Sequence, residues 1–188
     1  MDRDREDDSL KYVTALEPPD FRRVMEAYSE DIWNYAYFLS KKRELADDLA
    51  QETFVKAFKQ LGSYRGEASV KTWLIAITRN TWYSYRKTAF IRKVTLVGFL
   101  PSKGAAVSAE TEYMRRAYSD EVWEAVLALP LKYREALVLQ AHYHMSVEEI
   151  GKMQGISATA VKSRLRRAKE RAGKLLKERG AWDEEDRV

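Results

Sequence analysis

The chain has 188 residues and a net charge of +4, and 45% of its residues are hydrophobic, enough to bury a core in one or two small domains. It contains no cysteine, which excludes disulfide bonds and thiolate metal sites, and its two histidines leave little for metal binding or acid–base catalysis. No apolar run approaches the roughly 18 residues of a membrane span, and the acidic start MDRDREDDSL is unlike a signal peptide, so we expect a cytoplasmic protein without a cofactor.

The charge is distributed unevenly along the chain. Residues 1–20 hold seven acids and three bases, and residues 180–188 hold four acids and one base. The body between them, residues 21–179, carries a net charge of +11. A basic body between acidic ends is typical of a nucleic-acid-binding protein, and we hypothesise that the acidic ends screen it.

The first predicted helix follows a tail with few apolar residues. Pro18 and Pro19 end this tail, and Asp20 is expected to cap the helix. Apolar residues at helical spacing then form one stripe, which comprises Phe21, Val24, Met25, Tyr28, Ile32, Tyr35, Ala36 and Leu39. Such spacing recurs along the chain, and glycine and proline are few, so we predict an all-α fold.

A second helix is predicted over residues 43–61, with an acidic outer face. That face carries Asp47, Asp48, Gln51 and Glu52. Three carboxylates on adjacent turns could hold a divalent metal, which keeps a magnesium-dependent nuclease as one hypothesis. Catalytic sites of that kind usually draw ligands from separate elements, so we favour a solvated or partner-binding face and expect no metal site.

The next segments combine a loop with a helix of rings and cations. The run GSYRGEAS, residues 62–69, predicts a loop, and KTWLIAITRNTWYSYRK predicts a helix over residues 71–87. The side chains expected to point outward are Arg79, Asn80, Tyr83, Arg86 and Lys87. Rings interleaved with cations suit single-stranded nucleic acid, although a core helix with snorkelling cations explains the pattern equally well.

A linker and a second helical unit follow. Residues 89–118 contain an apolar run, VTLVGFL, and then small residues, which indicates a linker. A helix ending at Pro130 carries one apolar stripe, which comprises Val122, Trp123, Val126 and Leu129. Another helix is predicted from Tyr133 to about Tyr143. The unit therefore contains two helices before its last segment.

That last segment predicts a helix-turn-helix. Ser146 can cap one helix with Glu149 completing a capping box, Gly155 breaks that helix, and Ser157 can cap the next. The second helix buries a stripe comprising Val161, Leu165, Ala168, Ala172 and Leu175. Residues 160–179 hold nine Lys or Arg against two acids, which suits a helix entering a major groove. A solvated basic face is the plainer alternative.

Together these segments resemble the extracytoplasmic-function group of bacterial RNA polymerase sigma factors, within the sigma-70 family. ADDLAQETFVKAF at residues 46–58 is similar to region 2.2, and YRGEASVKTWLIAITRN at residues 64–80 is similar to regions 2.3 and 2.4. LPLKYREALVLQAHYHMSVEEIGKMQGISATAVKSRLRRAKERAGKLL at residues 129–176 is similar to region 4. An ordinary helix-turn-helix repressor or activator, with residues 20–87 as a dimerisation or ligand domain, is the competing hypothesis.

The resemblance implies two small helical domains joined by a flexible linker. Region 2 would span residues 20–88 and region 4 residues 119–179, with the linker at 89–118 and acidic tails at 1–19 and 180–188. The protein would bind core RNA polymerase through the beta-prime clamp and beta subunits, recognise promoter DNA and promote strand opening. It would have no catalytic activity of its own, and an anti-sigma factor is an expected partner.

The resemblance also assigns residues to each contact. Core polymerase would be docked by Asp47, Asp48, Gln51 and Glu52. The downstream (−10) element, with a flipped base in a loop pocket, would be bound by Tyr64, Arg65, Trp73, Arg79, Asn80, Tyr83 and Lys87. The upstream (−35) element would be read by Lys162, Ser163, Arg166 and Arg167, with phosphate contacts from Arg164, Lys169 and Arg171.

The sequence departs from the family pattern at three places. Val70 stands where an aromatic residue is usual, and Ser84 stands where an acid is usual. Thr159-Ala160 replaces the Gly-Thr that usually opens the recognition helix. Ala160 lacks a hydroxyl that would contact a phosphate, so one backbone contact is expected to be lost.

Overall fold

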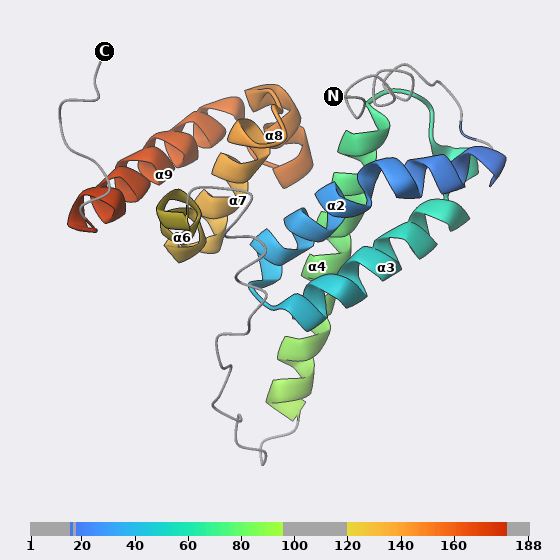
Figure 1. The fold of residues 1–188 in the computed structure, drawn as a ribbon, viewed down its shortest axis with the longest axis horizontal. Coiled ribbons are helices and arrows are strands. Elements are labelled where there is room, and N and C mark those ends of the chain that lie inside the picture. The colour runs from blue at the N-terminus through green and yellow to red at the C-terminus, as the bar shows by residue number, and fades with distance from the viewer. Residues whose placement is uncertain (1–15, 17, 96–119, 180–188) are drawn as a thin grey trace. The chain divides into compact units, whose positions relative to one another are not determined.

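The computed structural model describes residues 16, 18–95 and 120–179, and every regular element within them is helical (Figure 1). The chain divides into two compact units, residues 1–98 and 99–188. The elements in order are η1 (Pro18–Asp20), α2 (Phe21–Ser40), α3 (Arg43–Lys59), η2 (Leu61–Ser63), α4 (Val70–Thr95), α6 (Asp120–Ala128), α7 (Leu131–Ala141), α8 (Val147–Gln154) and α9 (Ala158–Glu178). The predicted all-α fold with two small helical domains is confirmed. Among these helices, none combines the length and apolar character needed to cross a membrane.

In the first unit, α2 and α3 lie side by side and α4 packs across both (Figure 1). Their apolar stripes meet in a core whose fully buried members include Val24, Ile32, Leu49 and Leu74. The hydroxyl of Thr53 donates to the Leu49 carbonyl at 2.7 Å and lies 3.3 Å from the Thr78 hydroxyl across the core. These polar groups can be buried because each has a partner.

Two helix ends in this unit differ from the prediction. Asp20 is the last residue of η1 and has helical backbone angles, and its side chain makes no cap hydrogen bond to α2. The helix α4 continues to Thr95, so the first residues of the predicted linker extend it. The rest of that linker, residues 96–118, and the tails at 1–15 and 180–188 lie outside the described residues.

The second unit is a four-helix domain, as predicted. One apolar cluster joins Leu129, directly after α6, with Tyr133 of α7 and with Ala168 and Ala172 of α9. The buried guanidinium of Arg134 donates to the carbonyls of Leu127 and Leu129 at 3.0 and 3.1 Å. These bonds satisfy carbonyls at the end of α6, which holds the turn between α6 and α7.

Candidate nucleic-acid interface

The helix-turn-helix consists of α8 and α9, and local signals define its ends. The Glu149 N–H donates to the Ser146 hydroxyl at 3.2 Å, while the Ser146 N–H donates to the Glu149 carboxylate at 2.8 Å. Gly155 ends α8 in the left-handed conformation, with φ of 66°. The Ser157 hydroxyl accepts from the Ala160 N–H at 3.2 Å and starts α9. The predicted capping box, helix break and second cap are confirmed.

The turn between these helices depends on a glycine inside α8. Gly151 is buried, and its carbonyl accepts from the Ile156 N–H at 3.0 Å. A Cβ at Gly151 would lie 2.9 Å from the Ile156 carbonyl oxygen, which is too close for unstrained contact. The missing side chain therefore lets the chain turn back tightly over α8 and sets where α9 begins.

One side of α9 is buried and the other is basic. The buried residues are Val161, Leu165, Ala168, Ala172 and Leu176. The last of these replaces the predicted Leu175, which is half-buried. The exposed cations are Lys162, Arg166, Arg167, Lys169, Arg171, Lys174, Lys177 and Arg179, whereas Ser163 and Arg164 are half-buried. The exposed side can meet a polyanion without unfolding any of the core.

Two of the predicted upstream-element residues have partners within the unit. Arg164 donates to the Gln154 side-chain oxygen at 2.8 Å, which ties α9 to α8. Arg166 pairs with Glu170 one turn later on the helix. That pair is exposed on both sides, so exchanging Glu170 for a DNA group costs little. Arg164 braces the motif, while Arg166 can turn to DNA.

Tyr133 on α7 lies beneath the basic side of α9 and was not predicted as a site residue. Its ring packs against Ala168 and is 5% exposed. The Arg171 guanidinium carbon lies 5.1 Å from the ring centroid, and the Lys132 ammonium lies 5.0 Å from it. Arg167 donates a hydrogen bond to the hydroxyl, which lowers the pKa of Tyr133. Tyr133 thus holds two of the predicted DNA-binding arginines in place.

On α4, rings and cations share one face. The Arg79 guanidinium carbon lies 4.5 Å from the Tyr83 ring centroid, and that of Arg86 lies 5.9 Å from the same ring. Arg86 also lies 5.8 Å from the ring of Trp82, which is buried. Asn80, one turn before Tyr83, is exposed. Rings, cations and an exposed amide therefore lie together on α4, a combination that suits single-stranded nucleic acid.

The loop before α4 is shaped by Tyr64, which lies in the core of the unit. Tyr64 is 7% exposed, its hydroxyl donates to the Ala68 carbonyl at 2.8 Å, and its ring centroid is 5.1 Å from that of Trp73. This burial raises the pKa of Tyr64. Arg65, by contrast, is exposed. Of the two predicted loop contacts, only Arg65 presents its side chain at the surface.

The acidic face of α3 is partly engaged in contacts within the unit. The Asp47 carboxylate accepts from the Trp33 indole N–H at 2.6 Å, and Glu52 pairs with Lys56 at 2.7 Å. The residues of this face that are exposed are Asp48, Gln51 and Glu52. Within residues 16, 18–95 and 120–179, no group of three or more His, Asp and Glu side chains is close enough together to hold a metal ion.

Three residues that hold site side chains are not marked as site residues by any pattern in the sequence: Trp33, Tyr133 and Gln154. Each lies on a different helix from the residue it holds. Helical periodicity could identify Tyr133 as a core residue, but no local pattern marks its contact with α9. Only the packing of the helices brings these pairs together.

Known proteins share both units. The family model for Sigma-70 region 2 matches residues 24–89, and the family model for Sigma-70 region 4 matches residues 119–171. The RNA polymerase sigma factor YlaC of Bacillus subtilis is 31% identical over 148 residues, which cover 76% of this chain and 83% of that protein. The ECF RNA polymerase sigma factor SigM of the same organism is 30% identical over 164 residues, covering 86% and 97%.

A solved structure shares the fold. The sigma factor RpoE from Bartonella quintana, crystallised in complex with the anti-sigma factor NepR, matches with a TM-score of 0.69 and 27% identity. The match covers 84% of this chain and 97% of that chain. The two family matches fall one on each unit, and the relatives and the solved structure match over most of the chain. The chain belongs to the extracytoplasmic-function group of RNA polymerase sigma factors.

Proposed function

We propose that this sigma factor divides its work among three surfaces: α9 for the upstream element, α4 with its preceding loop for the downstream element, and α3 for core RNA polymerase. The protein directs the polymerase to promoters and promotes strand opening. The polymerase supplies the active site, and this chain performs no chemistry of its own. The observation that carries the proposal is the presence of an exposed basic recognition helix and a ring–cation helix on two separate units of one chain.

The upstream element is proposed to be read by the exposed side of α9. Lys162 and Ser163 lie in its first turns, and Arg166 and Arg167 follow one turn later. Arginine can donate two hydrogen bonds to a guanine edge in the major groove. Arg164 would then act on phosphate or through Gln154, and Lys169 and Arg171 on phosphates.

The downstream element is proposed to be bound as a single strand along α4. Tyr83 offers a ring for stacking, Asn80 offers a base-edge partner, and Arg79 and Lys87 follow the phosphates. Arg65 would contact a flipped base beside the loop. Tyr64 and Trp73 would hold the loop in shape, since their rings pack on each other. Contacts to unstacked bases offset the cost of opening the duplex.

Core polymerase is proposed to dock on α3 through Asp48, Gln51 and Glu52, with Asp47 alongside. Supporting this, Asp47 is oriented by Trp33, whose ring stacks on Tyr37 with centroids 5.5 Å apart. An acidic face on a protein with a net charge of +4 suits a basic protein surface rather than DNA.

The remaining assignments follow from the family. Region 2 would span residues 20–88 and region 4 residues 119–179, with the linker at 89–118 beginning as the end of α4. Because polymerase and promoters are cytoplasmic, the protein is proposed to act in the cytoplasm. An anti-sigma factor is a proposed partner, because the similar sigma factor of Bartonella quintana was crystallised with one.

The test combines core polymerase with two charge-reversed variants. We expect Asp48→Lys with Glu52→Lys to weaken polymerase binding about tenfold or more, because like charges would then face each other. Glu26→Lys, at an exposed position on α2, is the control and should bind normally. Runoff transcription on a promoter library then measures promoter choice. Unchanged polymerase affinity in the double variant would remove α3 from the docking surface.

A further inference from the structure

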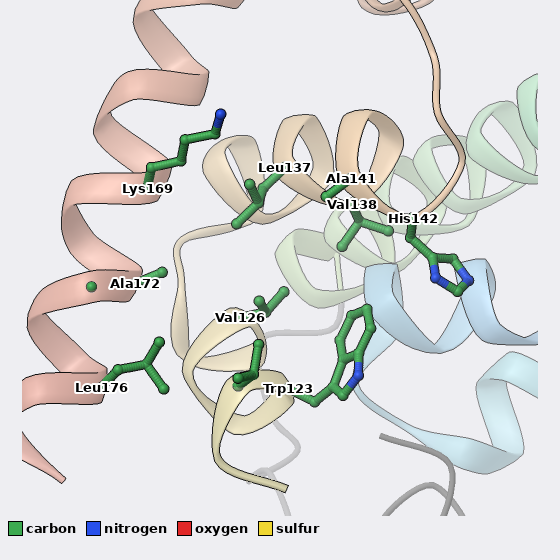
Figure 2. A pocket seen from close by; sticks show the side chains of 11 residues that line it. Trp123, Val126, Leu137, Val138, Ala141, His142, Lys169, Ala172 and Leu176 are labelled. Atoms are coloured by element: carbon green, nitrogen blue, oxygen red, sulfur yellow. The ribbon is translucent and has the colours of Figure 1, made fainter. Parts of the chain in front are cut away.

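A groove of about 600 Å³ lies on the second unit between α6, α7 and α9 (Figure 2). Its walls include Trp123 and Val126 from α6, Val138 from α7 and Leu176 from α9. Val122 at its rim is 43% exposed. Apolar concavities of this size usually receive another apolar group.

Gly173 keeps the groove open on the α9 side. It lines the groove, and nothing lies within 4 Å of the point where its Cβ would be. Packing therefore does not require a glycine at position 173. Glycine is present there even though it makes a helix less stable than alanine does. A larger side chain at this position would project into empty space in the groove.

The groove changes character along α9. Leu176 lies at one end, toward the C-terminus of the helix, and Lys169 carries its ammonium group at the other (Figure 2). Lys162, two turns before Lys169 and on the same flank by helical periodicity, is exposed. Moving back from the end of α9, the surface is therefore first apolar and then basic.

The sequence that follows α9 also begins with apolar residues and then becomes charged, with the opposite sign. Gly180 and Ala181 are followed by Trp182 and then by four consecutive acids, Asp183 to Asp186. An extended chain advances at most about 3.6 Å per residue, so Trp182 can reach about 11 Å from Arg179 and Asp186 about 25 Å. Along the helix axis, Leu176 lies about 4.5 Å and Lys169 about 15 Å before Arg179, at about 1.5 Å per residue.

We propose that residues 180–188 fold back along α9, with the Trp182 indole in the apolar end of the groove and the acidic run against Lys169. A glycine at position 180 suits such a reversal, because glycine as a residue type can adopt left-handed backbone angles without strain. The docked tail neutralises one flank of the recognition helix and closes the groove to other apolar partners. The effect on promoter DNA rests on the proposed function, whereas the occupancy of the groove does not.

Fluorine NMR of the full chain tests the occupancy directly. The chain has five tryptophans, so 5-fluorotryptophan labelling gives five signals, and Trp182→Phe assigns one of them. We expect the Trp182 signal to be shielded from solvent and Trp182→Phe to shift the signal of Trp123 in the groove wall. Gly173→Leu should fill the groove and move Trp182 to a solvent-exposed position.

The control for that substitution is Lys174→Leu, at the neighbouring exposed residue, which should leave Trp182 shielded. A solvent-exposed Trp182 in the unsubstituted chain would overturn the proposal and leave the groove to another segment or a partner. Shielding that disappears on dilution would also overturn it, because the occupant would then be the tail of a second copy.

A DNA-binding measurement tests the consequence. Neutralising Asp183, Glu184, Glu185 and Asp186 as Asn and Gln should tighten duplex binding by the free protein about three- to tenfold at low salt, because exposed charge interactions are individually weak. The control neutralises Asp2, Asp4, Glu6 and Asp7, which changes the net charge equally. Equal tightening of duplex binding in the tail variant and in the control variant would refute a local contact between the tail and α9. No tightening with a shielded Trp182 would refute only the effect on DNA.

Discussion

The cations of α4 and those of α9 are presented in different ways. On α4, Arg79 and Arg86 lie over aromatic rings of their own helix, at 4.5 to 5.9 Å from the ring centroids. On α9, Arg166 and Arg167 project from an exposed surface, and Tyr133, whose hydroxyl accepts a hydrogen bond from Arg167, belongs to another helix. The first surface mixes stacking and charge, whereas the second is mainly charge.

This difference matches two kinds of DNA target. Stacking surfaces recognise bases that have left the duplex, whereas exposed arginines on a rigid helix recognise groove edges and phosphates. Binding through α9 should therefore depend more steeply on salt, since each phosphate contact contributes a slope of about 0.9 for duplex DNA against about 0.7 for a single strand. The variants below test this contrast.

The largest expected effect on DNA binding is at Arg167. Arg167→Ala should weaken binding to the correct upstream duplex by about 1–3 kcal/mol if the contact to guanine is bidentate. Fluorescence anisotropy on the correct and a scrambled duplex measures this loss. Lys174→Ala, at an exposed position further along α9, is the control and should cost little on either duplex. An equal loss on both duplexes for Arg167→Ala would make it a phosphate contact.

The α9 surface should also depend on the tight turn that positions it. Gly151→Ala should lower the free energy of unfolding of the second unit by about 1–2 kcal/mol, because overpacking costs about 1–3 kcal/mol and the better helix propensity of alanine returns up to about 1 kcal/mol. Urea unfolding followed by circular dichroism measures it. Gly173→Ala, where a Cβ meets nothing within 4 Å, should stabilise instead. Stabilisation by both substitutions would contradict the close contact at Gly151.

On α4 the ring of Tyr83 should matter for single strands alone. Tyr83→Leu should weaken binding to the single-stranded downstream element by about 1 kcal/mol, the lower end for a stacked base, because Arg79 already covers one side of the ring. Filter binding with single-stranded and duplex oligonucleotides separates the two cases. Tyr85→Leu, on another side of the helix, serves as the control. If duplex binding fell equally, α4 would not be a single-strand surface.

A smaller effect is expected from the ring beneath α9. Tyr133→Phe keeps the ring near Arg171 and Lys132 but removes the hydroxyl that accepts from Arg167. Tyr133→Phe should lose part of the sequence preference that Arg167→Ala loses. The double variant should lose no more than Arg167→Ala does alone. A double-mutant cycle on the correct duplex measures this coupling. Additive losses would show that Tyr133 acts independently of Arg167.

The smallest expected effect is a change in stability at alkaline pH, which should have opposite signs in the two units. The pKa of Tyr64 is raised by burial above its usual 10.0, so its contribution to stability is present below pH 10.0 and lost as pH rises through the raised pKa. The pKa of Tyr133 is lowered by Arg167, so its contribution is fully present above pH 10.0 and lost as pH falls through the lowered pKa. Urea midpoints from about pH 9 to 11 should therefore change in opposite directions relative to the matching Phe variants.

Much of the helix-turn-helix could be predicted because its signals are local. The capping box of Ser146 and Glu149, the break at Gly155 and the cap at Ser157 each involve residues within three positions of one another. The end of α4 could not be placed in this way. Residues 88–95 contain neither glycine nor proline, so nothing in the sequence stops the helix at the predicted boundary. Asp20 failed as a cap because η1 already gives it helical angles.

The loop residue Tyr64 shows a different limit. An aromatic residue beside Arg65 suited a base-binding loop, but packing against Trp73 and a hydrogen bond to Ala68 place it in the core. Burial lowers the free energy of an aromatic ring more than exposure on a loop does. The sequence shows that an aromatic ring is present at position 64, but it does not show which side chains will cover that ring.

Three features follow from the sequence alone: the chain is helical, a capped helix-turn-helix carries a basic side, and rings and cations alternate on α4. These follow from periodicity, caps and charge, which act over a few neighbouring residues. Helix packing is what brings each of these side chains to its partner: Arg167 to Tyr133, Arg164 to Gln154 and Asp47 to Trp33. Such pairs depend on how helices distant in sequence pack, so no local pattern specifies them.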